Sequence, residues 1–325
     1  MKMNEFEMIR AIREMFSDLP VRGTGIGDDA AVLHHPGSLL TTDTMVDGVH
    51  FILDKTDLAD LGYKVMAVNL SDIAAMGGYP DAALLTLGLP KPFTDAQFLR
   101  LMTGIHDSAI LYRCALAGGD IVRSDTLFIT VAMTGHPIKE PILRSGAKPG
   151  DIIYISNKVG DSALGLKLLQ APHSVKVKSA NYFLSRHFCP SPRLKLIEYL
   201  TEHYIIRSCI DISDGVLADL QHIAEESGTG YFLEMNELPV SAEEIGKEFE
   251  KDPFFFYTLA ATGGEDYELL FTSEQSIDSA AVYEHTGVSV TPVGRILESG
   301  YRIGYFEKEF SPSDFKTGFR HFEGE

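Results

Sequence analysis

The segment KEPILRSGAKPGD at residues 139–151 most constrains how this chain can fold. It holds two prolines and two glycines, residue types that interrupt helices and strands and favour turns. The chain has 325 residues, which is long for one core and typical of two domains of ordinary size. We therefore expect a first domain over residues 1–140 and a second over residues 141–325.

Strand and helix patterns alternate on both sides of this segment, which predicts an α/β fold with mixed, α+β character. The elements expected before it are an amphipathic helix from Asn4, strands at 38–44, 83–89 and 126–135, a helix at 57–76, and a helix opened by a Thr94–Gln97 capping box. The elements expected after it are a strand at 151–156, a helix at 161–170, a strand at 208–213, and a helix from Val216. Both halves thus combine strands with helices.

Aspartate recurs in six short stretches of the chain, and in five of them it stands beside glycine, serine or threonine. The six stretches are GIGDDAAVL at 25–33, TTDTMVDGVHF at 41–51, NLSDIAAMGG at 69–78, GGDIVRSD at 118–125, DISDG at 211–215 and GGED at 263–266. An isolated Asp-Gly or Ser-Asp is more often a turn or a helix cap. Their recurrence instead favours an oxygen cage for a hard cation.

The places of these aspartates in the predicted elements suggest how such a cage could form. Residues 41–43 are expected at the end of a strand or in the turn after it, and a glycine turn at 118–119 is expected to present Asp120. Asp211 and Asp214 fall at a strand-to-helix junction, where free backbone amides favour phosphate. Two carboxylates about 4 Å apart repel by roughly 4 kcal/mol at an effective dielectric near 20, so such a cluster needs cations or protons. Because Mg²⁺ usually shares its ligands with phosphate oxygens, the pattern indicates a polyphosphate ligand.

Three further side chains are open to two interpretations. Arg123 and Arg144 could each clamp a phosphate, and a surface role is the competing interpretation for either one. His50 could meet a substrate or pack as a structural histidine.

Composition and missing motifs exclude several classes of function. Lys and Arg total 28 against 46 Asp and Glu, and the net charge of −18 argues against binding to nucleic acid or to an anionic membrane. There is no P-loop, no HExxH and no GxSxG motif. The three cysteines form no CxxC pair, and neither a signal peptide nor an apolar run of about 18 residues is present. We therefore expect a cytoplasmic protein.

Taken in order, these motifs together with LRSGAKPGD and GGEDYELLF resemble thiamine-monophosphate kinase, a family of the aminoimidazole ribonucleotide synthetase superfamily. The resemblance runs from about residue 5 to residue 322. It implies that residues 1–140 bind ATP and magnesium and form a mixed sheet that pairs into a dimeric barrel, so the protein would be a homodimer. Residues 141–325 would be an α/β domain that completes the nucleotide and substrate site.

The resemblance also implies a reaction and the residues that perform it. ATP would donate its γ-phosphate in line to thiamine monophosphate, assisted by several Mg²⁺ ions, to give thiamine diphosphate. The metal ligands would be Asp29, Thr41, Thr42, Asp43, Asp72, Asp120, Asp211 and Asp214, and catalysis would act through the metals held by Asp43, Asp72 and Asp120. The ATP contacts would be Gly119, Asp120, Arg144 and Ser213, and the substrate contacts would be His50, Glu265 and Phe319.

Two further expectations concern the general base and the residue at position 319. The acceptor phosphate is already ionised near neutral pH, so no general base is expected. Position 319 is often Tyr or Trp in the family, whereas this chain has Phe319, which keeps ring stacking and loses a hydroxyl hydrogen bond.

Other members of the superfamily fit the sequence less well. A selenophosphate synthetase would be expected to carry a reactive cysteine or selenocysteine near its amino terminus, whereas the first cysteine here is Cys114. A hydrogenase-maturation dehydratase would be expected to end in cysteine, whereas this sequence ends in HFEGE. Aminoimidazole ribonucleotide synthetase remains an alternative, although NLSDIAAMGG and FRHF favour the kinase. The alternative of another class is a non-catalytic protein that binds Mg·ATP without consuming it.

Overall fold

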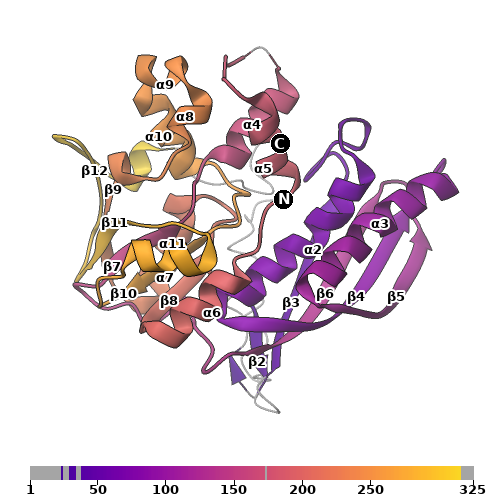
Figure 1. Cartoon of the computed structure of the whole chain (residues 1–325), viewed down its shortest axis with the longest axis horizontal. Coiled ribbons are helices and arrows are strands. Elements are labelled where there is room, and N and C mark those ends of the chain that lie inside the picture. Colours follow the sequence, from indigo (N-terminus) through magenta and orange to yellow (C-terminus); the bar gives the residue numbers. More distant parts are fainter. Residues whose placement is uncertain (1–22, 25–28, 34–37, 173, 316–325) are drawn as a thin grey trace.

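Two mixed β-sheets, each with its own helices, make up the computed structural model, which describes residues 23–24, 29–33, 38–172 and 174–315 (Figure 1). Within these residues the first sheet has six strands in the order β1-β2-β3-β6-β4-β5. The second has seven, in the order β13-β12-β9-β11-β7-β10-β8. The mixed α/β class expected from the sequence is confirmed.

The elements of the first part surround its sheet. They are β1 Gly23–Thr24, β2 Ala31–Leu33, β3 Ser38–Val46, η1 Leu53–Lys55, α2 Leu58–Ala75, β4 Gly78–Leu89, α3 Asp95–Tyr112, β5 Ala115–Arg123 and β6 Phe128–Pro137. The helix expected from Asn4 lies outside the described residues. The predicted capping box is confirmed, because the Gln97 amide donates to Thr94 Oγ1 at 3.2 Å and the Thr94 amide donates to Gln97 Oε1 at 2.9 Å.

The elements of the second part begin after the Pro- and Gly-rich segment. They are β7 Ile152–Ser156, α4 Asp161–Gln170, α5 Ala180–Phe188, α6 Leu194–His203, β8 Ile206–Asp211, α7 Val216–Ser227, β9 Gly230–Glu234, η2 Met235–Glu237, α8 Ala242–Ile245, α9 Lys247–Lys251, α10 Pro253–Thr262, β10 Leu269–Ser273, α11 Ser279–Thr286, β11 Val290–Leu297, β12 Tyr301–Tyr305, β13 Lys308–Phe310 and η3 Pro312–Asp314. None of the described helices is both long enough and apolar enough to cross a membrane.

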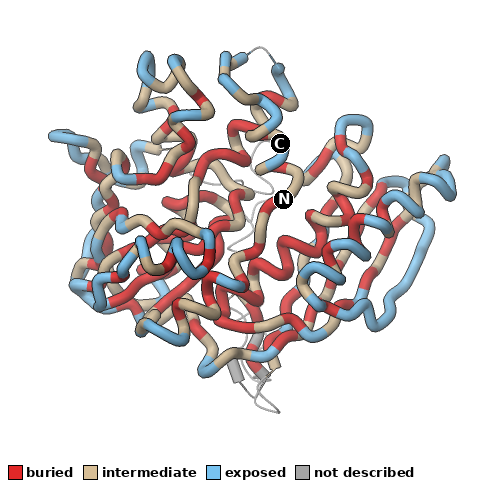
Figure 2. The backbone as a smooth tube through the Cα atoms, in the orientation of Figure 1, coloured by how far each residue is buried: buried red, intermediate tan, exposed pale blue. Residues whose placement is uncertain are grey.

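Helix α2 is buried on most sides and joins the two parts (Figures 1 and 2). Asp57 caps its start by accepting from the Ala59 amide at 2.8 Å. A Cβ atom on Gly62 would lie 2.2 Å from the Leu101 carbonyl oxygen, so the absence of a side chain lets α2 and α3 cross closely over one face of the first sheet. Buried residues of α2 and of the second sheet, such as Leu70 and Phe271, belong to one apolar core cluster. The helix is therefore placed to present side chains to both parts.

Strand β3 is longer than expected, and the prediction that residues 41–43 end a strand is wrong. The strand pairs with β6 from Leu39 to Val46, because the β6 ladder continues beyond the polar residues. Side chains alternate along it, so Thr41 and Asp43 share the inner face with buried Leu39, while Thr42 lies on the outer face.

The glycine turn predicted at residues 118–119 is also wrong, because both glycines lie inside β5. This strand runs parallel to β4 with Gly119 opposite Leu85. A Cβ atom at position 119 would lie 1.8 Å from the Leu85 carbonyl oxygen. The glycine therefore serves a close approach of two backbones and not a reversal of the chain. Asp120 pairs opposite Thr86, on the outer face of the sheet, in a strand that is exposed along its length (Figure 2).

Candidate functional site

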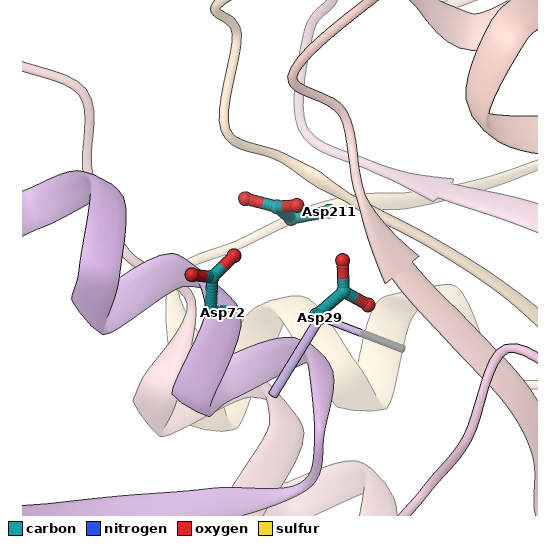
Figure 3. Close-up of side chains that lie close together, drawn as sticks. All are labelled: Asp29, Asp72 and Asp211. Atoms are coloured by element: carbon teal, nitrogen blue, oxygen red, sulfur yellow. The ribbon is translucent and has the colours of Figure 1, made fainter. Parts of the chain in front are cut away.

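Three aspartates from distant parts of the chain converge where the two parts meet. Asp29 precedes β2, Asp72 lies on α2 and Asp211 ends β8. One carboxylate oxygen of each lies within 4.8 Å of the corresponding atoms of the other two. Figure 3 shows the three carboxylates turned toward a common space.

Two side chains of β3 extend this cluster. The Thr41 hydroxyl donates to Asp72 Oδ2 at 2.5 Å and so fixes the orientation of that carboxylate. The pKa of Asp43 is raised above its ordinary value by burial, and Asp29 adds to the rise, whereas a hydrogen bond with Asp72 lowers it. Asp29, Asp43, Asp72 and Asp211 are hereafter called the aspartate cluster.

Electrostatic repulsion within the cluster favours a bound cation or proton. The pKa of Asp72 is raised well above its ordinary value, first by burial and then by Asp43, Asp211 and Asp29. The pKa of Asp211 is raised in the same way, by burial and then by Asp29. Two charges 4.8 Å apart repel by about 3.5 kcal/mol at an effective dielectric near 20. Such an arrangement of carboxylates is costly without positive charge between them.

The donor set of the cluster fits a hard divalent cation. Asp29 Oδ2 and Asp211 Oδ2 are buried, and neither has a hydrogen-bond partner within the described part of the chain. Buried carboxylate oxygens normally have such partners, and their absence here is what a metal ligand requires. The other oxygen of Asp29 accepts from Arg144 Nη2 at 2.7 Å. That ion pair brings the LRSGA segment to the cluster.

The loop between β8 and α7 lies beside the cluster and carries Ser213 and Asp214. Free amides were expected at this junction, but two of its amides are occupied. The Asp214 and Gly215 amides donate to Asp219 Oδ2 at 3.2 and 3.1 Å. Asp219 is buried, and its pKa is raised well above its ordinary value, first by burial and then by Asp214 and Asp211. The sequence interpretation missed this residue, although an aspartate in the first turn of the predicted helix was a usable signal.

The GGED loop rests directly on the β8–α7 loop. The Glu265 amide donates to the Ser213 carbonyl at 2.8 Å, and the Tyr267 amide donates to the Ile212 carbonyl at 2.9 Å. Glu265 therefore lies next to the serine predicted to contact ATP. Its Oε2 atom lies 3.4 Å from Lys64 Nζ and 3.4 Å from His187 Nδ1, two residues that the sequence interpretation did not single out.

Other predicted site residues lie away from the cluster within one chain. Thr42 is on the outer face of the sheet, where its hydroxyl donates to the Val131 carbonyl at 3.0 Å. Gly119 and Asp120 are on β5, three strands from β3 in the sheet order, or about 14 Å at ordinary strand spacing. Asp120 also lies on the opposite face from Asp43. One chain alone does not bring these residues to the aspartate cluster.

Two of the three predicted substrate contacts can be placed. His50 lies in the turn after β3, where its Nδ1 accepts from the Val46 amide at 3.1 Å. Glu265 lies in the GGED loop described above. Phe319 lies outside the described residues.

Known proteins of one family match nearly the whole chain. A family described as AIR synthase related protein, N-terminal domain, matches residues 27–136. Thiamine-monophosphate kinase of Escherichia coli (strain K12) is 40% identical over 280 residues, which cover 84% of this chain and 83% of the relative. The same enzyme of Aquifex aeolicus (strain VF5) is 30% identical over 325 residues, 99% of each chain.

Solved structures with a similar fold cover nearly the whole chain. The structure described as AaThiL complexed with AMPPCP and TMP matches with a TM-score of 0.84 and 30% identity, covering 99% of both chains. A HypE–HypF complex matches with a TM-score of 0.72 at 20% identity, which concerns the fold alone. Both parts of this chain therefore share one architecture with the solved structures.

Proposed function

Because this chain belongs to the thiamine-monophosphate kinase family, we propose that its aspartate cluster holds the magnesium ions for transfer of a phosphoryl group between two anionic substrates. The chain phosphorylates thiamine monophosphate to thiamine diphosphate with ATP, a step of thiamine diphosphate biosynthesis. The observation that supports the metal assignment is the convergence of Asp29, Asp72 and Asp211. Two of these aspartates, Asp29 and Asp211, have a buried oxygen with no hydrogen-bond partner among the described residues.

The residues of the cluster act by position and charge. Bound there, Mg²⁺ would cancel the repulsion between the two phosphates and stabilise charge on the transferred group. Thr41 orients Asp72, which supplies negative charge at a fixed position together with Asp43. Asp29 and Asp211 complete the cluster. No side chain needs to remove a proton, because the acceptor oxygen is already ionised.

Nucleotide contacts come from the residues next to the cluster. Burial lowers the pKa of Arg144, but the charge of Asp29 and the hydrogen bond to it raise that pKa above its ordinary value. Arg144 is thus a permanent cation held at the edge of the cluster, where it can meet the ATP phosphates. Ser213 and Asp214 lie on the adjoining loop and complete this side. His50, Glu265 and Phe319 are proposed to meet thiamine monophosphate.

A second copy of the chain is proposed to supply the remaining residues. The outer face of the first sheet exposes Leu40, Leu84 and Val122, and Leu84 is 52% exposed. Such a row of apolar side chains on an open sheet is typical of a subunit interface. Asp120 lies on this same outer face, so pairing of two sheets through it would bring Asp120 against the partner subunit, where it is proposed, with Gly119 beside it in β5, to serve the partner's site. Residues 1–140 would then form the dimer, and residues 141–325 would complete each site.

Mixing two inactive variants tests this arrangement. Asp72→Asn and Asp120→Asn should each lower turnover by orders of magnitude. If Asp120 serves the partner's site, a heterodimer has one intact site, and an equal mixture after subunit exchange should regain about a quarter of the wild-type activity. Mixtures that stay as inactive as the separate variants would show that Asp120 does not act across the interface.

Product analysis separates the enzyme from a protein that only binds nucleotide. The chain is incubated with ATP, Mg²⁺ and thiamine monophosphate, and chromatography is used to look for thiamine diphosphate. Product should form with wild type and fall at least a hundredfold, roughly, in Asp43→Asn. Binding of Mg·ATP without any product, with free thiamine also inert, would contradict the kinase assignment.

A further inference from the structure

An ion pair between a buried lysine and a half-buried glutamate, which the proposed transfer step does not use, joins α2 to the GGED loop. The Lys64 side chain is only 4% exposed, and its Nζ lies 3.4 Å from Glu265 Oε2. Lysine is almost never fully buried unless it is paired with an acid. The pair crosses from the first part of the chain to the second, so it fixes the loop against the helix that also carries Asp72.

A histidine from a third element contacts the same oxygen. His187 on α5 places Nδ1 3.4 Å from Glu265 Oε2 and 3.0 Å from Ser162 Oγ. Burial and then the Lys64 charge lower the pKa of His187 to about 4, although Glu265 opposes the change, so the imidazole is neutral near pH 7. Glu265 is therefore held by one cation and one neutral ring, both on Oε2. Among the described residues both of these contacts fall on Oε2, and the side chain is 25% exposed, so a ligand can reach the carboxylate.

The backbone of Glu265 is in a conformation that its side chain disfavours. Its φ is +64° and that of Tyr267 is +51°, whereas most residues other than glycine avoid positive φ. Such strain persists where the surroundings fix the chain, and it is common at ligand sites. Two backbone hydrogen bonds to the β8–α7 loop hold this segment in place, and so do the contacts of Glu265 with Lys64 and His187.

Helix α2 carries both the lysine that contacts Glu265 and an aspartate of the cluster. Lys64 precedes Asp72 by eight residues on α2, which corresponds to about 12 Å along the helix axis. In thiamine monophosphate a two-carbon chain joins the phosphate to the cationic thiazolium ring, and the aminopyrimidine lies beyond that ring. With the phosphate at the cluster, the ring would extend toward Glu265.

We propose that Lys64 and His187 are positioning residues that hold the Glu265 carboxylate for the thiazolium ring, and that this trio gives the site its preference for a cationic ring over a neutral one. The inference rests on the proposed function, because it takes Glu265 as a substrate contact. It adds two residues and a basis for specificity to that assignment. Lys64 acts here through Glu265 and not on the reacting phosphates.

A double-mutant cycle tests whether Lys64 acts through Glu265. Glu265→Gln and Lys64→Met should each raise the KM and the calorimetric Kd for thiamine monophosphate by roughly 10-fold to 100-fold, while the KM for ATP changes less than about twofold. The KM and Kd of the double variant for thiamine monophosphate should be no higher than those of Glu265→Gln alone. Lys64→Arg should recover part of the loss, and Lys195→Met, which changes an exposed lysine on α6, should behave as wild type.

The outcomes distinguish this inference from the proposed function. If wild type makes no thiamine diphosphate, the proposed function fails. If wild type is active but the two single losses multiply in the double variant, the positioning role alone is overturned. If circular dichroism shows that Lys64→Met does not fold, His187→Gln takes its place. It should raise the KM for thiamine monophosphate in the wild-type background and should not raise it further in the Glu265→Gln background.

A substrate analogue tests the preference for charge directly. The probe is thiamine monophosphate with a neutral thiophene ring in place of the thiazolium. Wild type should bind it at least about tenfold more weakly than the natural substrate, and Glu265→Gln should bind the two nearly equally. Equal affinity of wild type for both compounds would overturn the proposal.

Discussion

Replacing Asp72 by asparagine should stabilise the metal-free protein while it destroys catalysis. The change removes one charge from the aspartate cluster and keeps an oxygen that can accept from Thr41. One pair of charges at 4.8 Å costs about 3.5 kcal/mol at an effective dielectric near 20. Proton uptake relieves part of this cost, because burial and the neighbouring aspartates raise the pKa of Asp72. A gain of about 2 to 3.5 kcal/mol is therefore expected in EDTA.

Differential scanning calorimetry measures this gain. For a chain of 325 residues, it corresponds to a rise in Tm of about 3 to 5 °C. Added Mg²⁺ should raise the Tm of wild type more than that of Asp72→Asn, because the variant has lost a ligand. The kcat of the variant should fall by roughly two orders of magnitude or more at saturating Mg²⁺.

A matched variant separates this effect from the general cost of changing a buried acid. Asp151 is also buried, but it accepts from the Lys148 amide at 2.8 Å and lies 3.3 Å from Arg207 Nε, away from the cluster. Asp151→Asn should lower the Tm equally with EDTA and with Mg²⁺. If Asp72→Asn behaves like this control, or keeps near-wild-type turnover, the metal assignment is refuted.

Three further predictions concern β5, the pH dependence of stability and the substrate contact at position 319. Gly118 and Gly119 have φ of +157° and +154°, so alanine strains the backbone at either position. Gly119→Ala should lower the Tm by several degrees more than Gly118→Ala, because only its Cβ would lie 1.8 Å from the Leu85 oxygen, whereas the Cβ at position 118 meets a side-chain atom at 3.7 Å. Equal shifts would contradict the close-approach explanation. Burial raises the pKa of Asp266 to about 7 from its ordinary value of 3.8, so the folded state holds a proton that the unfolded state loses, and stability should fall as the pH rises from about 4 to about 7. Urea titrations should show a flatter profile for Asp266→Asn over that range, and an unchanged slope would rule out this group as the cause. Phe319→Ala should weaken thiamine monophosphate and leave ATP affinity unchanged, and equal losses in calorimetric titrations of both ligands would count against ring stacking.

Elements with strong local signals could be predicted from the sequence. Helix α2 combines helix-spaced apolar residues with a capping aspartate and a glycine stop at Gly77, whose φ is +68°. The capping box at Thr94 is equally local. In both cases the residues that decide the structure lie within a few positions of each other, so no tertiary information is needed.

Features decided by distant partners could not be predicted in the same way. The end of β3 depends on how far the β6 ladder extends, so the polar residues at 41–43 gave a false strand end. Gly119 looked like a turn because the close approach to Leu85 involves a residue 34 positions away. Lys64 and His187 carried no motif, since their importance arises only when α2, α5 and the GGED loop meet at Glu265.

The metal assignment at the aspartate cluster is tested most directly by locating the cation. Crystals grown with Mn²⁺ and a non-hydrolysable ATP analogue would be measured at the manganese absorption edge. The structure predicts anomalous peaks at about 2.1 Å from carboxylate oxygens of Asp29, Asp72 and Asp211. Peaks elsewhere with none at this cluster would contradict the account.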